Sequence, residues 1–279
     1  MYNPDTMRRI RLPRIYGPLV LVLGAVVVNP AYASLVFDGV ATGQGAGIGS
    51  SNTILTIQNT PFETGCVGWN GSADVIGSAA CQGGLSPAIV GGNEKTGNSQ
   101  TQTQTVAATG LLSGQTLAVI LNVSEPGGTL FTIANLSLTI YSPTGVVLFN
   151  SGNLFGAGFP PGGGVTVNSS FQGQGNLGFG FIPDSVQAAA ISPFICTSAL
   201  TPGCAGIANV LNANNRIGLA VLLTNTQGGN ETFSVADTSN ISFQTPEPVT
   251  GLTVCSGLII LGMIRRVRNS RKPARRAIG

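Results

Sequence analysis

This chain of 279 residues contains no histidine, and charged residues make up only 8% of it. Without histidine it lacks the most common general base and cannot form a Ser-His-Asp or Cys-His catalytic arrangement. It also contains no G-x-S-x-G, H-E-x-x-H or Walker pattern. Two carboxylates alone can hydrolyse a glycoside, but the acidic residues lie far apart in the sequence and no pair stands out. We therefore expect a protein that is not an enzyme and that uses no cofactor.

The absence of histidine also weakens the case for a metal site. A zinc site would need four cysteine thiolates at tight spacing, which this chain does not offer. Calcium prefers oxygen ligands, and four aspartates are candidates, but they show no D-x-D-x-D spacing. They are Asp38, Asp74, Asp184 and Asp237. Turn and cap roles are favoured for each of them, and Asp184 stands where a helix N-cap belongs. We expect no metal.

Basic residues are scarce between residues 34 and 245, where only Lys95 and Arg216 occur. Eight acidic residues accompany them, so this body carries a net charge of −6. They are Asp38, Glu63, Asp74, Glu94, Glu125, Asp184, Glu231 and Asp237. The formal charge of +3 for the whole chain therefore comes from its two ends. Because phosphate contacts need clustered Lys and Arg, the body is not expected to bind nucleic acid.

The amino end has the features of a secretory signal peptide. Residues 7–14 contain four arginines, residues 16–28 are apolar, and Asn29-Pro30 breaks the segment. Ala31 and Ala33 then form a small-x-small pattern. This order predicts a signal peptide over residues 1–33, cut between Ala33 and Ser34. The alternative is an uncleaved membrane anchor, which the alanine pattern after a helix breaker disfavours.

Four cysteines lie in the body, namely Cys66, Cys81, Cys196 and Cys204. An even number in an exported protein favours disulfides. The simplest pairing is local, Cys66 with Cys81 and Cys196 with Cys204, and two other pairings remain open. Cys255 lies in the apolar run near the carboxyl end, where a role as a small apolar residue is favoured over lipidation.

Several stretches of the body are typical of strands because they are rich in β-branched residues or alternate between apolar and polar. They are residues 52–58, 117–123, 131–141, 146–149, 216–224 and 231–237. Ser142-Pro143-Thr144-Gly145 predicts a turn, and hence a hairpin between 131–141 and 146–149. Gly228-Gly229 predicts a second hairpin, between 216–224 and 231–237.

The remaining segments are shorter or richer in glycine. Frequent glycine, proline and asparagine predict a loop over residues 59–98. The alternation of Gln and Thr over 100–105 predicts either a polar edge strand or a solvated linker. Gly-Phe-Gly-Phe at 178–181 indicates a close approach or a bulge within a strand. Short helices are expected at 186–190 and 205–212. The body, residues 34–245, is thus expected to be mainly β, an antiparallel and jelly-roll-like β-sandwich with one or two short helices.

The carboxyl end combines a short motif, an apolar run and a basic cluster. Pro246-Glu247-Pro248 precedes the apolar residues 249–264, and a basic tail follows over 265–279. Arg265, Arg266 and Arg268 open this tail and act as a basic stop. Sixteen helical residues span about 24 Å, a little less than a hydrocarbon core. The run predicts a transmembrane helix whose basic end stays cytoplasmic, so the body lies outside the inner membrane.

This arrangement, residues 246–279, resembles the PEP-CTERM sorting signal of Gram-negative bacteria that make exopolysaccharide. Softer echoes of recurrent segments in such proteins occur at 214–219 and 231–233. The tail after the arginines is longer than usual for the family. The resemblance implies processing by an exosortase, a membrane-embedded enzyme similar to cysteine transpeptidases. It also implies an exported, non-enzymatic protein, anchored in the inner membrane in transit and then placed at the cell surface or outside the cell.

Two other functions are weighed against this one. A carbohydrate-binding module of the polysaccharide matrix would gather Trp69, Tyr141 and the phenylalanines of 155–181 on one exposed face. For Trp69, however, a packing role at the edge of the core is favoured over stacking on a sugar. A divergent glycan-active enzyme would need two acids within about 5–10 Å of each other in a cleft.

Overall fold

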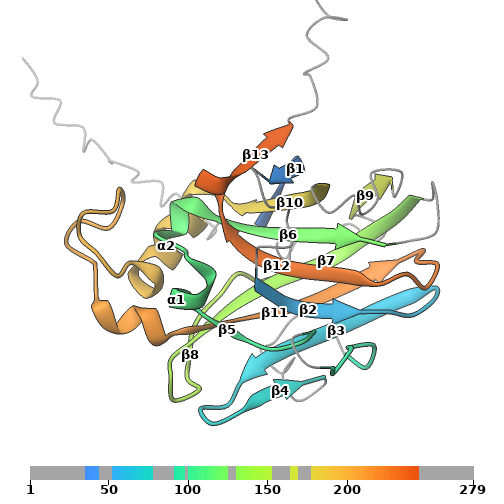
Figure 1. Cartoon of the computed structure of the whole chain (residues 1–279), viewed down its shortest axis with the longest axis horizontal. Coiled ribbons are helices and arrows are strands. Elements are labelled where there is room, and N and C mark those ends of the chain that lie inside the picture. The colour runs from blue at the N-terminus through green and yellow to red at the C-terminus, as the bar shows by residue number, and fades with distance from the viewer. Residues whose placement is uncertain are drawn as a thin grey trace, which may run out of the picture. The chain divides into compact units, whose positions relative to one another are not determined.

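The computed structural model describes the body as two antiparallel β-sheets with two short α-helices (Figure 1). The described residues are 35–43, 52–77, 91–97, 100–124, 130–152, 164–168 and 177–244. The predicted signal peptide and sorting signal lie outside them. Mainly β architecture with antiparallel pairing, as the sequence predicts, is confirmed.

The first sheet, sheet A, contains six strands that are all antiparallel to their neighbours. In spatial order they are β13 (Ile241–Gln244), β1 (Leu35–Gly43), β10 (Leu177–Pro183), β6 (Leu117–Val123), β12 (Glu231–Asp237) and β2 (Asn52–Ile57). The first and last strands of the body, β1 and β13, therefore pair with each other at one edge.

The second sheet, sheet B, is built around β11 and β7, which pair over the length of β11. Its order is β4 (Asp74–Ile76), β3 (Phe62–Trp69), β11 (Arg216–Thr224), β7 (Leu130–Tyr141) and β8 (Val147–Asn150). Two short strands join it off this path, β5 (Gln104–Thr105) on β11 and β9 (Val165–Asn168) on β7. The predicted hairpin of β7 and β8 is confirmed.

The main hydrophobic core draws on both sheets. Phe181 and Phe233 come from sheet A and Phe131 from sheet B, and all three are fully buried in one cluster. The predicted strand 117–123 matches β6, whose side chains are buried on both faces of the sheet. Its near-continuous apolar sequence follows from that position, because a strand covered on both sides has no solvent face for polar residues.

A smaller apolar cluster occupies the other face of sheet A, around Ile120. Phe243 of the edge strand β13 packs there, and its ring lies against Gly180 of β10. A side chain at position 180 would collide with that ring. The close approach predicted for the Gly-Phe-Gly-Phe segment is therefore confirmed, since Phe179 and Phe181 face the main core while Gly180 leaves room for Phe243.

Helices lie at the ends of the strands. α2 (Ser185–Ile195) begins after Asp184, whose carboxylate accepts a hydrogen bond from the Gln187 backbone N–H at 2.8 Å, as predicted. It runs beyond the predicted residue 190 because Ile191 and Ile195 are buried. The other helices are α1 (Val106–Thr109) and the 3-10 helices η2 (Gly114–Thr116), η5 (Val210–Asn214) and η6 (Thr238–Asn240). η5 replaces the helix expected at 205–212.

The predicted second hairpin is wrong. β11 and β12 exist as predicted, but β11 belongs to sheet B and β12 to sheet A. Each already has strand partners on both sides, so neither offers an edge to the other. The link between them crosses from one sheet to the other and is held by the Thr226 N–H, which donates to the Pro61 carbonyl at 3.1 Å.

The loop predicted for residues 59–98 is also wrong in part, because the segment contains β3 and β4. Glycine usually marks a turn, but Gly65 lies inside β3, against the side chains of Ile57 and Leu55 in sheet A. There the missing side chain lets the two sheets approach each other. The Gln/Thr run at 100–105 provides the edge strand β5, and Thr101 and Thr103 are buried.

Candidate functional site: the Trp69–Arg216 cluster

The predicted sorting residues and one disulfide candidate fall outside the described part of the chain. They are Ala31, Ala33 and Ser34 at the signal cleavage site, Pro246, Glu247 and Pro248 in the motif, Arg265, Arg266 and Arg268 in the basic stop, and Cys81. The other three body cysteines and Trp69 with its neighbours lie within the described residues.

The predicted disulfide between Cys196 and Cys204 is confirmed. Both cysteines are fully buried, and the bond closes a short loop directly after α2. The Cys196 carbonyl accepts hydrogen bonds from the Asn209 N–H at 2.9 Å and from the Asn212 side-chain amide at 2.9 Å. Cys66 is also disulfide-bonded, whereas its predicted partner Cys81 lies outside the described residues.

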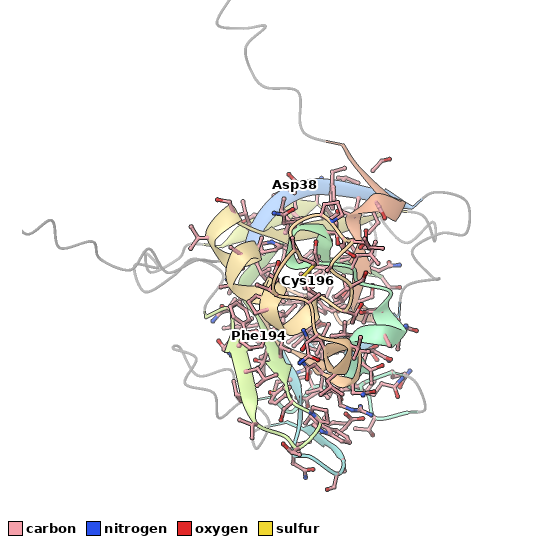
Figure 2. The ribbon with its side chains drawn as sticks, turned by 90° about the vertical axis from the view of Figure 1, so that its left-hand side faces the viewer. Asp38, Phe194 and Cys196 are labelled. Carbon is pink, nitrogen blue, oxygen red and sulfur yellow. A yellow bond between two sulfur atoms is a disulfide. The ribbon has the colours of Figure 1, made fainter. Side chains whose placement is uncertain are left out.

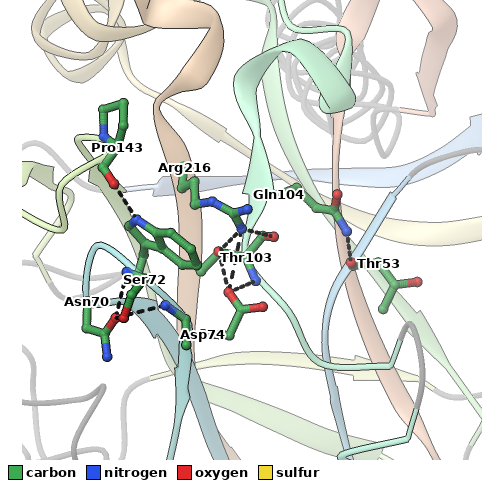
Figure 3. A network of polar contacts seen from close by, with 10 residues as sticks. Thr53, Asn70, Ser72, Asp74, Thr103, Gln104, Pro143 and Arg216 are labelled. Atoms are coloured by element: carbon green, nitrogen blue, oxygen red, sulfur yellow. Dashed lines mark hydrogen bonds and ion pairs between the residues drawn. The ribbon is translucent and has the colours of Figure 1, made fainter.

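Trp69, Asp74, Thr103 and Arg216 meet where β3 ends and β4, β5 and β11 begin (Figure 3). The Arg216 guanidinium carbon lies 3.8 Å from the centroid of the Trp69 ring. One guanidinium nitrogen donates to the Thr103 carbonyl at 3.1 Å and to its hydroxyl at 2.8 Å. The same nitrogen lies 3.7 Å from an Asp74 carboxylate oxygen. Arg216 therefore pairs with an acid.

The Asp74 carboxylate joins this cluster through one oxygen, Oδ1. It accepts hydrogen bonds from the Thr103 N–H at 3.0 Å and from the Thr103 hydroxyl at 2.5 Å. The side chains of Arg216 and Asp74 are 26% and 27% exposed, so solvent screens the ion pair in part. The stack of guanidinium on indole is the larger contribution, because a partly desolvated cation–π contact is worth about 1–2 kcal/mol.

The far edge of Trp69 is also occupied. Its indole N–H donates to the Pro143 carbonyl at 2.9 Å, in the turn between β7 and β8. Next to it, the Asn70 side-chain oxygen accepts from the Ser72 and Ala73 backbone N–H groups, both at 2.9 Å. The two turns pack closely, since a side chain at Gly71 would meet the Thr144 backbone. These contacts give Trp69 a packing role at the junction of the two turns.

The described aromatic residues do not gather on an exposed face. Tyr141 is buried, and burial raises the pKa of its hydroxyl although a hydrogen bond with Thr139 lowers it. Phe179 and Phe181 belong to the main core. Phe155, Phe159 and Phe171 lie outside the described residues. Arg216 covers one face of the Trp69 ring and so limits the surface of the ring that a ligand could reach.

Most carboxylates in the described residues accept hydrogen bonds from backbone N–H groups. Asp237 accepts from the Ser239 N–H at 2.9 Å and caps η6, the cap role that was favoured for it. Glu94 accepts from the Cys66 and Gly92 N–H groups, both at 2.7 Å. Across the described segments, no group of three or more Cys, Asp or Glu lies close enough together to hold a metal ion.

Sequence reasoning missed the core of this cluster. It placed Trp69 and Asp74 in a loop, and it named no acid for Arg216. The one hint in the sequence was the scarcity of cations, because a body with so few of them tends to use each in a specific contact.

Within the described ranges, no helix has the length and apolar character needed to cross a membrane. No protein-family model, no curated protein and no solved structure matches the chain.

Proposed function

We propose that this chain is a non-enzymatic exported protein that reaches the cell surface or the extracellular matrix through a PEP-CTERM and exosortase pathway. The structural observation that carries the proposal is the buried Cys196–Cys204 disulfide, because disulfides persist in oxidising compartments outside the cytosol. The sequence adds a signal peptide at residues 1–33 and the motif, apolar run and basic stop at 246–279.

The contacts in the body support a structural role. Arg216, Asp74, Asp184 and Asp237 each hold turns, caps or strand ends in place. A catalytic carboxylate would instead face a cleft where a substrate can reach it. The matrix polysaccharide remains the alternative ligand, and it would have to be recognised without the buried Tyr141 and Phe181.

We further infer that the body is a β-sandwich of the jelly-roll type. The order β2–β12–β6–β10 in sheet A and β3–β11–β7–β8 in sheet B supports this assignment. Strands that follow one another in sequence, such as β2 and β3, β6 and β7, or β11 and β12, lie in opposite sheets. Two interleaved Greek keys produce this alternation in a jelly roll.

The position of the motif suits processing by a membrane enzyme. Pro246 follows Gln244, the last residue of the edge strand β13, by two positions, and the apolar run begins at Val249. The two prolines keep the motif extended and prevent it from joining either the strand or the membrane helix. An exosortase would therefore meet an open segment between the folded body and the bilayer.

The decisive experiment is mass spectrometry of the intact mature protein from cells with an active exosortase. We expect the mass of a chain that begins at Ser34 and has lost the residues after about Pro248. A matched variant, P246A/E247A/P248A, should lose the signal peptide and keep the basic tail. An intact arginine-rich end in the wild type, or equal trimming of wild type and variant, would contradict the proposal.

A further inference from the structure

The segment between α2 and β11 has an unusual surface. Residues 185–215 contain no charged residue, although Asp184 and Arg216 flank them directly. Besides Val186 in α2 (61% exposed), four apolar side chains that follow α2 are exposed to solvent, and we call these four the apolar end. They are Leu200 (95% exposed), Val210 (73%), Leu211 (66%) and Ile207 (39%). Where such side chains form a continuous surface, they are typical of a site that contacts a partner or a membrane.

The backbone beneath the apolar end is firmly held. The Cys196–Cys204 disulfide closes the loop that carries Leu200 (Figure 2). The Asn212 side-chain amide donates to the Pro193 carbonyl at 2.7 Å and to the Cys196 carbonyl at 2.9 Å, which ties η5 to the end of α2. The apolar side chains are therefore presented outward on an ordered support, and they do not fold back onto the core.

The chain leaves little distance between the body and a bilayer. Five residue steps separate Gln244, the end of β13, from Val249, the start of the apolar run. Fully extended, they span at most about 18 Å. A folded domain of about 210 residues has a radius of gyration near 17 Å, so it is roughly 34 Å or more across. A body held this closely stays within about one radius of gyration of the membrane, so the end of the body that faces the bilayer can reach the headgroups.

The amino end indicates which end of the body faces the bilayer. Leu35 pairs with Pro183, and α2 begins at Ser185, so the chain from the signal peptide joins the body at the end where α2 and the apolar end lie. Seven residue steps lead from Leu35 back to Val28, the last residue of the apolar signal segment, a reach of at most about 25 Å. Before cleavage, this end of the body is therefore the one held near the bilayer.

We propose that the apolar end rests in the boundary between headgroups and acyl chains of the membrane while the protein is anchored in transit. The inference rests on the proposed anchoring function. Apolar side chains gain free energy when they enter this boundary, and the segment has no charge that would have to be desolvated. The contact would orient the body on the membrane, with α2 and η5 facing the lipid.

The test uses the full chain reconstituted in phosphatidylcholine vesicles that contain nitroxide-labelled phospholipids. A tryptophan is introduced by L211W at the apolar end or, as the matched control, by F62W at the start of β3. Phe62 is 58% exposed, and it lies at the end of sheet B opposite to Arg216, which adjoins η5. The parent protein, which contains only Trp69, provides the background signal.

We expect lipid nitroxides near the carbonyl region to quench the tryptophan of L211W at least twofold more than that of F62W. Equal quenching at both positions would overturn the proposal. The proposal would also be overturned if the tryptophan of L211W were protected from quenching and the protein formed cross-linked dimers, because the surface would then bind a second copy of the chain. Flotation of the vesicles measures membrane anchoring independently of the quenching. Protein that does not float with the vesicles contradicts the anchoring function, whatever the quenching shows.

Discussion

Arg216 has more structural partners than any other cation described in the body. It stacks on Trp69, donates to Thr103 and pairs with Asp74, and so it joins residues on or next to β3, β4, β5 and β11. A lysine could supply the charge but not the planar group that covers an indole and donates in two directions. The contribution of Arg216 to stability therefore depends on its shape as well as its charge.

Replacing Arg216 by alanine should lower the free energy of unfolding by about 1–2 kcal/mol, because the cation–π contact and two hydrogen bonds are lost. Arg216→Lys should lie between wild type and alanine. Urea unfolding of the purified protein measures both. The matched control is K95A, which removes the other cation of the body and should change stability by less than about 0.5 kcal/mol. Equal effects at the two positions would contradict the role given to the cluster.

Asp38 should make stability depend on pH. It lies at the bulge of β1, and desolvation raises the pKa of its carboxyl above 3.8. The folded state therefore holds this proton more tightly than the unfolded state, and the stability it adds is present below pH 3.8 and lost as the pH rises through the folded pKa. The charged form is the unfavourable one, so D38N should be more stable than wild type at pH 7.

The measurement for Asp38 is urea unfolding of wild type and D38N between pH 3 and pH 7. The difference between the two proteins should be small at the acid end and grow with pH until it levels off above the folded pKa. A difference that stays constant over this range, or one that favours wild type at neutral pH, would show that the carboxyl is not desolvated in the folded protein.

Among the elements, β13 depends on one packing contact. The ring of Phe243 lies over Gly180 and helps to hold this four-residue edge strand, which is followed two residues later by Pro246-Glu247-Pro248. G180A places a methyl group where the ring lies, and it should destabilise the protein by about 1–3 kcal/mol through overpacking. Hydrogen exchange should show faster opening of the β13 amides than in wild type.

A double-mutant cycle separates this contact from other effects at Gly180. In the F243A background the ring is gone, so G180A should have little further effect, and the two changes should be strongly non-additive. If G180A destabilises the F243A protein as much as it destabilises wild type, the close approach of the ring is not what position 180 requires.

The Cys196–Cys204 disulfide should stabilise the body mainly by constraining the unfolded chain. The two cysteines are eight residues apart, and the loop-entropy relation for such a short loop gives about 2–3 kcal/mol. C196A/C204A should therefore melt about 5–10 °C below wild type by circular dichroism. A reducing agent should lower the melting temperature of wild type more than that of the variant. Identical responses would contradict a stabilising role for this bond.

Prediction of the elements from sequence succeeded where the signal is local. The strand 117–123, the β7–β8 hairpin and the Asp184 cap depend on neighbours within a few residues. It failed for β3, because Gly65 reads as a turn residue unless the opposite sheet is known. It failed for the pairing of β11 with β12 because each of these strands pairs on both sides with strands that are distant in sequence.

For the whole molecule, the distribution of charge predicts a stepwise change on processing. The intact chain carries +3. Loss of residues 1–33 removes four arginines and one aspartate, which leaves nine basic and nine acidic residues and a net charge of zero. Loss of residues 249–279 removes seven more basic residues, leaving two basic and nine acidic ones and a net charge of −7.

Isoelectric focusing of cell fractions should therefore resolve three species: a basic precursor near pI 8.7, a near-neutral membrane intermediate and a strongly acidic mature form. The P246A/E247A/P248A variant carries one acid fewer, and it should stop at the intermediate, with a net charge of +1. An acidic form that appears equally with this variant, or a wild type that never becomes acidic, would show that the tail is not removed at the motif.

Residue composition and local patterns were enough to establish the β-rich character of the body, the positions of most strands, the order of basic and apolar segments at the two ends and the separation of charge between ends and body. These features depend on residue type and on near neighbours. The folded structure was needed to learn which strands pair, that Gly65 and Gly180 leave room for side chains from other strands, and that Arg216 covers Trp69. Such contacts join residues far apart in the chain, and burial between two sheets selects among them in ways that no local pattern records.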